Sequence, residues 1–261
     1  MAVFFVTPIG YTIGLSFTHA DHAGLTLSNY AAFFSNDRFT DALARSILMA
    51  SAAVIIASGF AYPLAWFLTY AVRPGRRLLL LFVLIAPFWT SFTIRAFSWQ
   101  LVLSDSGVIA FILGRILGEP IALGFLYTMS ASVFGLTLFG IMLITLTIFS
   151  VMVTIDPRLL EANRDLGGSE WQGFVEIVLP LSFPGWVIGA VLTFIICVGD
   201  YAVPTLLGGG FKPVLAQLML STLKGTYDLP MAATFAAVLM VVVLASALPL
   251  ALVRRQVRLQ G

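Results

Sequence analysis

Arg95 and Asp200 stand out because they are charged residues within or beside long apolar segments. A charge in the core of a bilayer costs roughly 2.5 to 3.5 kcal/mol, so each of these residues needs a physical reason to be there. Both fall toward the expected outer ends of apolar helices, where a long side chain can reach water. A structural ion pair and a contact with a charged ligand are both open explanations.

Three aromatic residues accompany these charges. Trp89 and Trp99 flank Arg95 along the chain, and Tyr201 follows Asp200. Aromatic ring faces attract cations, although such rings also gather at membrane interfaces without any ligand. We predict Trp89, Arg95, Trp99, Asp200 and Tyr201 as candidate residues of a substrate pathway.

The sequence lacks the groups that catalysis or metal binding would need. His19 and His22 share one polar loop, and the single cysteine, Cys197, lies in an apolar run, so no disulfide framework or thiolate site is available. Gly208–Gly210 precede Phe-Lys-Pro and do not form a nucleotide-binding P-loop. We expect no enzymatic activity, no metal and no cofactor in this chain.

The composition is that of an integral membrane protein. Of the 261 residues, 60% are hydrophobic and 10% are charged, and the mean hydropathy is +1.02. Such a chain cannot form a polar shell. The net charge of +2 comes from basic residues beside apolar blocks, where they direct topology, so we expect no nucleic-acid binding.

Apolar segments predict an all-α protein with six transmembrane helices in one domain over residues 1–261. Residues 1–17 are short for a span and are expected at the periphery, whereas residues 41–253 form the core. Val108–Leu117 is too short to span and is expected on the outer face. The predicted core spans are, in order, about 41–70, 78–99, 126–153, 185–199 and 229–253.

The first core span carries small residues at four-residue spacing, namely Ala53, Ala57, Ala61 and Ala65. Such a stripe lets the backbone of another helix approach closely. We therefore predict a packing face there, without chemistry of its own.

Basic residues gather in alternate connecting segments, which predicts the orientation of the chain. The residues in the proposed inner segments are Arg73, Arg76, Arg77, Arg158, Arg164, Arg254, Arg255 and Arg258. Those clearly outside are Arg38, Arg115, Lys212 and Lys224. Both termini and the polar stretch 156–184 are therefore expected in the cytoplasm. No internal repeat is evident, which weakens an inverted-repeat secondary transporter.

The polar stretch begins with the pattern of a short helix. Asp156 can cap a first turn that Pro157 opens, and the helix is expected to continue to Leu166. Gly167 with Gly168 can then supply a left-handed stop.

A second helix start follows this elbow. Ser169 offers an N-cap, and Gln172 stands three residues later, which is the spacing of a capping box. By composition alone the segment would be a solvated loop between two spans. A helix, an elbow and a second helix favour a segment that transmits motion.

The spacing of this stretch resembles the EAA motif of membrane subunits of ATP-binding-cassette importers. The matching positions are Glu161, Ala162, Gly167, Ile177, Leu179 and Pro180, whereas Asn163 replaces the second alanine. The resemblance implies that residues 156–180 form a cytoplasmic loop that couples to an ATPase. The residues expected to take part are Leu159, Leu160, Glu161, Ala162, Asp165, Gly167, Ile177, Leu179 and Pro180.

The likeness covers about residues 30–245 and is strongest to the spermidine/putrescine group of these permeases. The segments that carry it include Ala61–Trp66 (AYPLAW), Pro87–Ser91 (PFWTS), Ile94–Trp99 (IRAFSW), Leu160–Ala162 (LEA), Asp165–Gly167 (DLG), Gly199–Tyr201 (GDY) and Leu207–Gly209 (LGG). This resemblance implies a type I importer (MetI-like) permease fold in the bacterial cytoplasmic membrane, with a peripheral first helix.

The implied partners are a homologous second permease, two copies of an ATPase that binds ATP and Mg, and an extracytoplasmic solute-binding protein. The implied mechanism is alternating access driven by the ATPase. A polyamine would profit from Asp200 and nearby aromatic faces, whereas an anion would not. Another small amine, an amino acid or a phosphonate stays an alternative cargo, and a channel or ion-coupled transporter is the alternative of another class.

Overall fold

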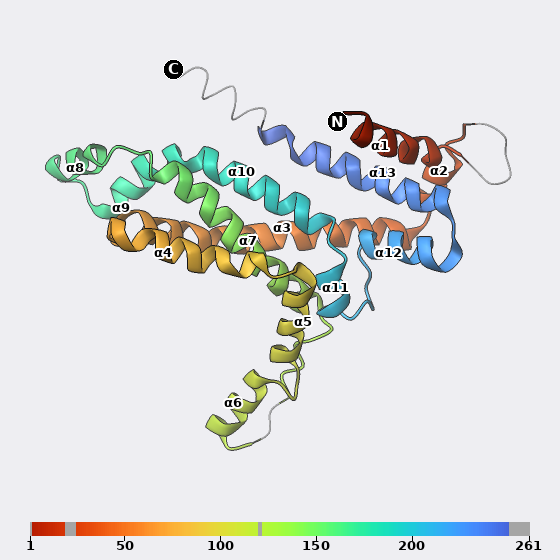
Figure 1. The fold of residues 1–261 in the computed structure, drawn as a ribbon, viewed down its shortest axis with the longest axis horizontal. Helices are drawn as coiled ribbons and strands as arrows, with labels where there is room; N and C mark the ends of the chain where they lie inside the picture. Colours follow the sequence, from red (N-terminus) through yellow and green to blue (C-terminus); the bar gives the residue numbers. More distant parts are fainter. Residues whose placement is uncertain (1, 19–24, 120–121, 251–261) are drawn as a thin grey trace. The chain divides into compact units, whose positions relative to one another are not determined.

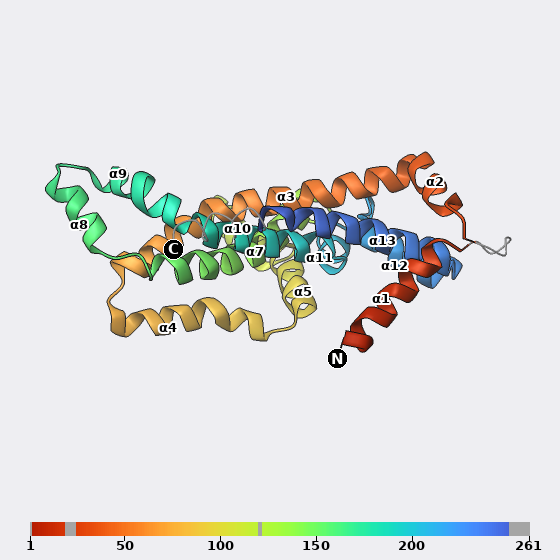
Figure 2. The same ribbon diagram turned by 90° about the horizontal axis from the view of Figure 1, so that it is seen from above.

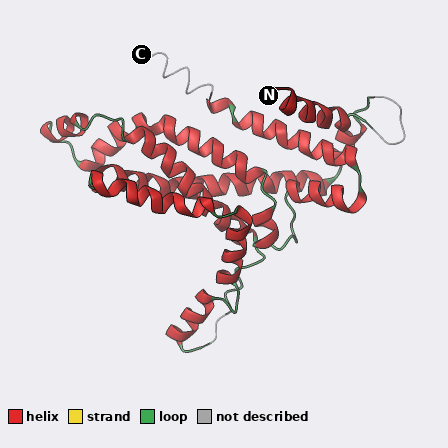
Figure 3. Ribbon diagram, in the orientation of Figure 1, coloured by secondary structure: helices red, strands yellow, loops and turns green. Residues whose placement is uncertain are grey.

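The computed structural model describes residues 2–18, 25–119 and 122–250, and its regular structure in these ranges is entirely helical (Figure 3). This confirms the predicted all-α class. Five helical runs in the described ranges are long and apolar enough to cross a membrane. They are Asp37–Ala71, Phe92–Leu117, Met129–Met152, Glu170–Val198 and Leu229–Leu250. The predicted number of six spans is not confirmed.

The predicted span 78–99 is not one continuous helix, because the structure breaks it in the middle. Helix α4 (Pro74–Ile85) ends in a 3-10 turn, η2 (Ala86–Trp89), and α5 (Phe92–Leu103) begins after a bend. Pro87 has no backbone N–H to donate to the carbonyl of Val83, which favours the change from an α-helix to a 3-10 turn. Ala86 before it is still helical, and the chain becomes extended only at Thr90, whose ψ is 138°.

Helix α6 (Val108–Leu117) has the predicted bounds and ends at Gly118, whose φ is +79°. It is grouped with α5 in the 26-residue apolar stretch Phe92–Leu117, although residues 104–107 between the two helices are not helical. The sequence had treated 108–117 alone, as too short to span.

The predicted span 185–199 starts earlier in the structure than the sequence indicated. Its run comprises α9 (Glu170–Gln172), the π-helix η3 (Gly173–Val178) and α10 (Leu179–Val198). Pro180 lies inside this run, because η3 and Leu179 on its N-terminal side are helical as well. The prolines at 180 and 184 therefore do not stop the helix.

The N-terminal segment is helical and packs on the last long helix. Helix α1 (Ala2–Ser16) lies beside α13 (Leu229–Ser246), as both views show (Figures 1 and 2). Its 15 residues are fewer than the roughly 20 that a bilayer requires. The expectation of a peripheral position in the assembled protein stays a prediction.

The loop expected over residues 18–40 contains α2 (Ser28–Ser35). The side chain of Asn29 is buried and donates hydrogen bonds to the carbonyl oxygens of Ser16, at 3.1 Å, and Thr18, at 2.7 Å. These bonds satisfy carbonyls at the end of α1. His19, His22, Arg254, Arg255 and Arg258 lie outside the described residues.

The remaining helices complete the element order. They are α3 (Asp37–Trp66), η1 (Phe67–Ala71), α7 (Met129–Met152), α8 (Arg158–Asp165), α11 (Ala202–Leu206), α12 (Leu215–Ser221) and η4 (Thr222–Thr226). The chain divides into two compact units. The first comprises Met1–Ser51, Thr93–Gly135 and Ile195–Ser246, and the second comprises Ala52–Phe92, Leu136–Phe194 and Ala247–Gly261.

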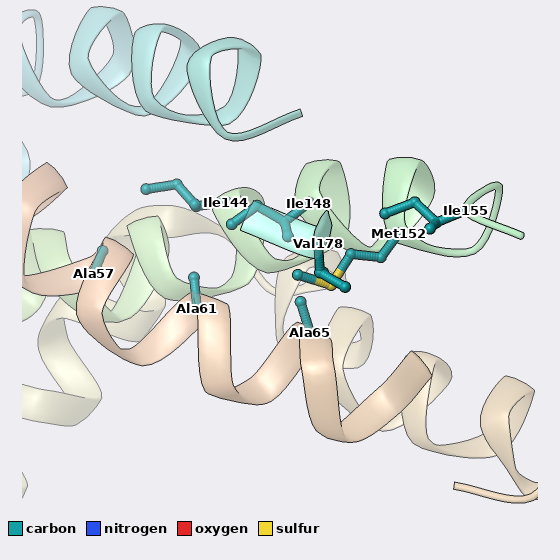
Figure 4. Packing of buried hydrophobic residues seen from close by; sticks show 8 residues of the cluster. All are labelled: Ala57, Ala61, Ala65, Ile144, Ile148, Met152, Ile155 and Val178. Atoms are coloured by element: carbon teal, nitrogen blue, oxygen red, sulfur yellow. The ribbon is translucent and has the colours of Figure 1, made fainter. Parts of the chain in front are cut away.

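The core of the second unit is built on the alanine stripe. Ala57, Ala61 and Ala65 of α3 are fully buried, and they pack in one cluster with side chains of α7 and η3 (Figure 4). The other members of the cluster are Ile144, Ile148, Met152, Ile155 and Val178. The predicted packing face is thereby confirmed, because small side chains on α3 leave room for the branched ones opposite.

The core of the first unit is aromatic at its centre. Phe33 of α2 and Phe235 of α13 are fully buried, and their ring centroids lie 5.7 Å apart. Phe39 contacts both rings, at 6.0 Å and 4.9 Å. These contacts join α2, α3 and α13 within the unit.

Candidate functional site

The elbow of the polar stretch has the geometry that its glycine predicted. Gly167 has a φ of +83°, in the left-handed region that favours glycine. The N–H of Gly167 donates to the carbonyl of Arg164 at 2.9 Å, and the N–H of Gly168 donates to that of Asn163 at 2.8 Å. This pair of bonds is a Schellman motif, which ends α8 abruptly. Gly168 itself has no positive φ, unlike the expectation for the pair.

The start of α8 also follows the sequence pattern, shifted by one residue. The helix runs from Arg158 to Asp165, whereas the sequence predicted Pro157 to Leu166. The Asp156 carboxylate accepts the N–H of Arg158 at 3.0 Å. Asp156 therefore holds the chain at the entrance of the helix as expected.

The predicted capping box is present on the far side of the elbow. Gln172 N–H donates to Ser169 Oγ at 3.2 Å, and Ser169 N–H donates to Gln172 Oε1 at 2.7 Å. Two backbone donors at the start of α9 are satisfied in this way. A surface ion pair, Arg164–Glu170 at 2.6 Å, also crosses the elbow, though exposed pairs contribute little.

Asn163 has a structural role at the position where it departs from the motif. Its amide donates to the carbonyl of Ser169 at 3.2 Å, so it ties the end of α8 to the start of α9. A β-carbon built at Gly168 would clash with Asn163 Oδ1, and one at Gly173 would lie 3.1 Å from Asn163 Nδ2. The asparagine therefore fills the inside of the elbow, and both glycines leave it room.

The predicted coupling residues divide between two faces of the segment. Leu160 is half-buried against the core cluster of the second unit, and Ile177 and Leu179 are half-buried as well. The exposed group comprises Leu159, Glu161, Ala162, Asp165, Gly167 and Pro180. Leu160 thus anchors the segment to the bundle, while Leu159, Glu161 and Ala162 are open to a partner.

Two exposed apolar side chains were missed by the sequence analysis. Leu166 is 90% exposed, and Trp171 is 70% exposed, one on each side of the elbow. The sequence indicates their exposure, because a large apolar residue at the beginning or end of a short polar helix has few apolar neighbours to pack against. With Leu159, at 44% exposure, they form what we call the elbow surface: Leu159, Leu166 and Trp171.

A chain of aromatic contacts joins the elbow surface to α3. The ring centroid of Trp171 lies 5.5 Å from that of Phe174, and Phe174 lies 5.3 Å from Trp66. Trp66 continues to Tyr70 at 4.5 Å. Such contacts stabilise beyond their buried area, so the elbow is stiffly connected to the helices behind it.

Asp200 follows the fifth span and caps the short helix α11. Its two carboxylate oxygens accept the N–H groups of Ala202, at 3.1 Å, and Val203, at 2.9 Å. Burial raises the pKa of Asp200, while these two backbone donors lower it in part. A carboxylate has further lone pairs beyond these two bonds, so Asp200 retains acceptor capacity for a ligand.

The other predicted pathway residues are more scattered. Tyr201 is the residue before α11 and is 49% exposed. Arg95 and Trp99 are half-buried on α5, where the ring of Trp99 meets that of Phe134 edge-to-face at 5.3 Å. Trp89 ends η2, is 75% exposed and belongs to the second unit, whereas the others belong to the first.

Known proteins resemble this chain over most of its length. Residues 24–258 match the model of a family described as "Binding-protein-dependent transport system inner membrane component". The chain is 33% identical over 250 residues to the spermidine/putrescine transport system permease protein PotB of Salmonella typhimurium (strain SL1344). This match covers 93% of the chain and 85% of the relative.

Solved structures share the fold at lower identity. A crystal structure of a bacterial ABC transporter for import of the acidic polysaccharide alginate matches with a TM-score of 0.75, 18% identity and coverage of 97% of this chain and 91% of that one. A second alginate transporter structure, in complex with an alginate pentasaccharide-bound periplasmic protein, matches with a TM-score of 0.74 and 16% identity, covering 98% and 90% of the two chains.

Proposed function

Because the chain belongs to the family of binding-protein-dependent transport system inner membrane components, we propose that it is the permease subunit through which an ATP-binding-cassette importer brings a polyamine such as spermidine or putrescine into the cytoplasm. The observation that supports a polyamine as the cargo is the 33% identity with a spermidine/putrescine permease over 93% of the chain. Asp200 beside Tyr201 supports a cationic cargo, since a carboxylate and a ring face can replace the hydration of an ammonium group.

The coupling segment supplies the mechanical part of this function. Residues 156–180 dock on the ATPase from the cytoplasmic side, with Glu161 making a polar contact and the elbow surface filling a groove. The Schellman turn, the capping box and Asn163 hold the two arms of the segment in one geometry. A segment of fixed geometry can transmit a rigid-body shift to the next span, which a disordered linker could not do.

The assembly has further parts that this chain lacks. A homologous second permease forms the other half of the membrane unit, and two ATPase copies bind ATP and Mg. An extracytoplasmic binding protein delivers the cargo. The six-span, MetI-like topology with both termini in the cytoplasm belongs to the same proposal, as does the peripheral place of residues 1–17.

Alternating access follows from this arrangement. When ATP closes the ATPase dimer, the two docked coupling segments are drawn together, and the membrane halves open toward the binding protein. Hydrolysis then returns the inward-facing state. Within this chain, α10 continues the helical run of the coupling segment from Glu170 to Val198, so a displacement at the elbow reaches the span directly.

The decisive experiment uses the complete importer in liposomes. ATP hydrolysis and uptake of labelled spermidine are measured with empty and with loaded binding protein. We expect loaded binding protein to stimulate hydrolysis and uptake to require ATP. Uptake without ATP would indicate a channel or ion-coupled transporter, and stimulation by an amino acid or phosphonate in place of a polyamine would overturn the cargo.

A further inference from the structure

A cavity of about 310 Å³ lies within the first compact unit, apart from the candidate pathway residues. It is lined by residues from the first part of α3, the start of α7 and the loop after α11. We call it the cationic pocket. The lining residues used here are Arg45, Tyr127, Ser132, Gly208, Phe211 and Lys212.

The loop over this pocket is held in place by its backbone. Gly209 and Gly210 have φ angles of +68° and +71°, and the N–H of Tyr127 donates to the carbonyl of Leu207 at 2.6 Å. A β-carbon at Gly209 would lie 2.9 Å from Cβ of Tyr127. The close approach requires glycine there, so Lys212 is presented from a defined loop rather than from a free one.

The charge of the pocket is positive. Arg45 and Lys212 both line it, and none of its described lining residues is Asp or Glu. Arg45 is fixed by its Nε–H, which donates to the carbonyl of Pro213 at 3.2 Å. Its Nη1 lies 3.6 Å from Asp41, whose side chain is 69% exposed, and this distance is longer than a direct charged hydrogen bond. The two cations and the hydroxyl group of Ser132 are suited to a carboxylate. The two positive charges would repel a polyamine.

We propose that the cationic pocket receives a carboxylate side chain of the extracytoplasmic binding protein when that protein docks. The inference rests on the proposed function, which supplies a binding protein and places Lys212 on the outer side. Arg45 belongs to the same pocket, since it donates to the carbonyl of Pro213 beside Lys212. Charge complementarity favours a carboxylate of this partner, because positive and negative groups face each other across protein–protein interfaces. A solved structure of this fold is in complex with a periplasmic protein.

The test compares two lysines in the complete importer. Lys212→Glu reverses a charge in the pocket, and Lys224→Glu makes the same change at an exposed lysine of the same unit that does not line it. We expect Lys212→Glu to raise the Kd of loaded binding protein on the order of tenfold, because contacts between charged groups steer and hold such partners. Lys224→Glu should change it less than twofold, and the basal ATPase rate should stay as in the wild type.

A zero-length carbodiimide cross-link identifies the carboxylate of the binding protein that contacts Lys212. The reagent joins a lysine amine to a carboxylate in direct contact, so the docked wild-type complex should yield a peptide that links Lys212 to an Asp or Glu of the binding protein. The Lys212→Gln variant should lose this product, and the Kd difference between it and the wild type should shrink at high salt. An unchanged Kd for Lys212→Glu, or no cross-link at Lys212, overturns the proposal.

Two other outcomes are separable. If Lys212→Glu alters hydrolysis only in nanodiscs with anionic phospholipid while the Kd of the binding protein is unchanged, the pocket holds a lipid headgroup and the proposal is wrong. If wild-type importer is not stimulated by loaded binding protein at all, the proposed function fails together with this inference. If loaded binding protein stimulates the wild-type importer and binds the Lys212 variants with an unchanged Kd, this inference alone fails.

Discussion

Gly167 forms the turn on which the coupling segment depends. Its φ of +83° places it where a side chain clashes with its own backbone, and open space surrounds the position where a β-carbon would be built. Any effect of substitution at Gly167 therefore reports on backbone geometry and not on crowding by neighbours.

We expect Gly167→Val to uncouple ATP hydrolysis from transport. A β-branched residue in the left-handed region costs on the order of 1–2 kcal/mol, which is enough to favour another elbow geometry. Uptake should fall several-fold while hydrolysis by the assembled importer persists. Gly167→Asn is the control, because asparagine tolerates this region. A fully active Gly167→Val importer would contradict the role of the elbow.

Asp200 combines a structural contact with an available charge. Asp200→Asn removes the charge and keeps one of the two oxygens that accept the N–H groups of Ala202 and Val203. We expect polyamine uptake to fall on the order of tenfold, as a charge-assisted hydrogen bond contributes about 1.5–3 kcal/mol. Basal hydrolysis should persist. Unchanged uptake would leave Asp200 as a capping residue only.

The pH dependence of uptake provides a second measure of the same contact. Burial raises the pKa of Asp200, so its charged form is lost at a higher pH than for an ordinary aspartate as the pH falls. Uptake through the wild-type importer should decrease in that range, and the Asp200→Asn variant should lack this decrease.

At the scale of the element, the coupling segment is one stiff unit with an exposed apolar surface. Leu160 and Phe174 fix it to the core cluster of the second unit, while Leu166 and Trp171 face outward. An apolar side chain that is 90% or 70% exposed on a polar helical segment is typical of a protein–protein contact.

We expect Trp171→Ala and Leu166→Ser to weaken the binding of the ATPase. Truncation of a central aromatic contact typically costs about 2 kcal/mol or more, which predicts a rise in the Kd of the ATPase of at least tenfold for Trp171→Ala. Leu27→Ser serves as the control, since Leu27 is 65% exposed outside the segment. If the ATPase binds both elbow variants normally, the elbow surface is not the docking surface.

At the scale of the whole molecule, the N-terminal helix is attached through a small hydrogen-bonded network in the first unit. Asn29 binds two carbonyls at the end of α1, and the hydroxyl of Tyr30 lies 2.7 Å from Ser16 Oγ. Thr234 of α13 reaches the carbonyl of Ser16 at 3.4 Å. This network fixes the end of α1, while the rest of the helix packs on α13.

We expect Asn29→Leu to loosen α1 without abolishing transport. The substitution keeps the volume of the side chain but removes the donor of the Thr18 carbonyl and leaves the Ser16 carbonyl with the longer bond from Thr234, which costs roughly 1–3 kcal/mol. Limited proteolysis should cut between residues 18 and 27 more readily, while uptake stays within about twofold of the wild type, as a peripheral helix requires. Loss of uptake with an assembled importer would place α1 nearer the substrate pathway.

Local features of this protein were predictable because they depend on neighbours within a few residues. The Schellman turn at Gly167, the capping box of Ser169 and Gln172, and the bounds of α6 follow from residue types alone. The alanine stripe on α3 was predictable for the same reason, since helical periodicity places those residues on one face. The family was recognisable from fixed spacing in the coupling segment.

Contacts between distant parts of the chain were decided by the tertiary structure. The π-helix η3, the inward position of Leu160, the burial of Asn29 and the bonds from Asp200 to α11 all depend on packing partners that a local pattern does not specify. The cationic pocket joins Arg45 to Lys212 across more than 160 positions, which is apparent only once α3, α7 and the loop after α11 have been brought together. Sequence determines which helices form, because their hydrogen bonds are local, whereas the packing of side chains from separate helices determines which charged groups meet.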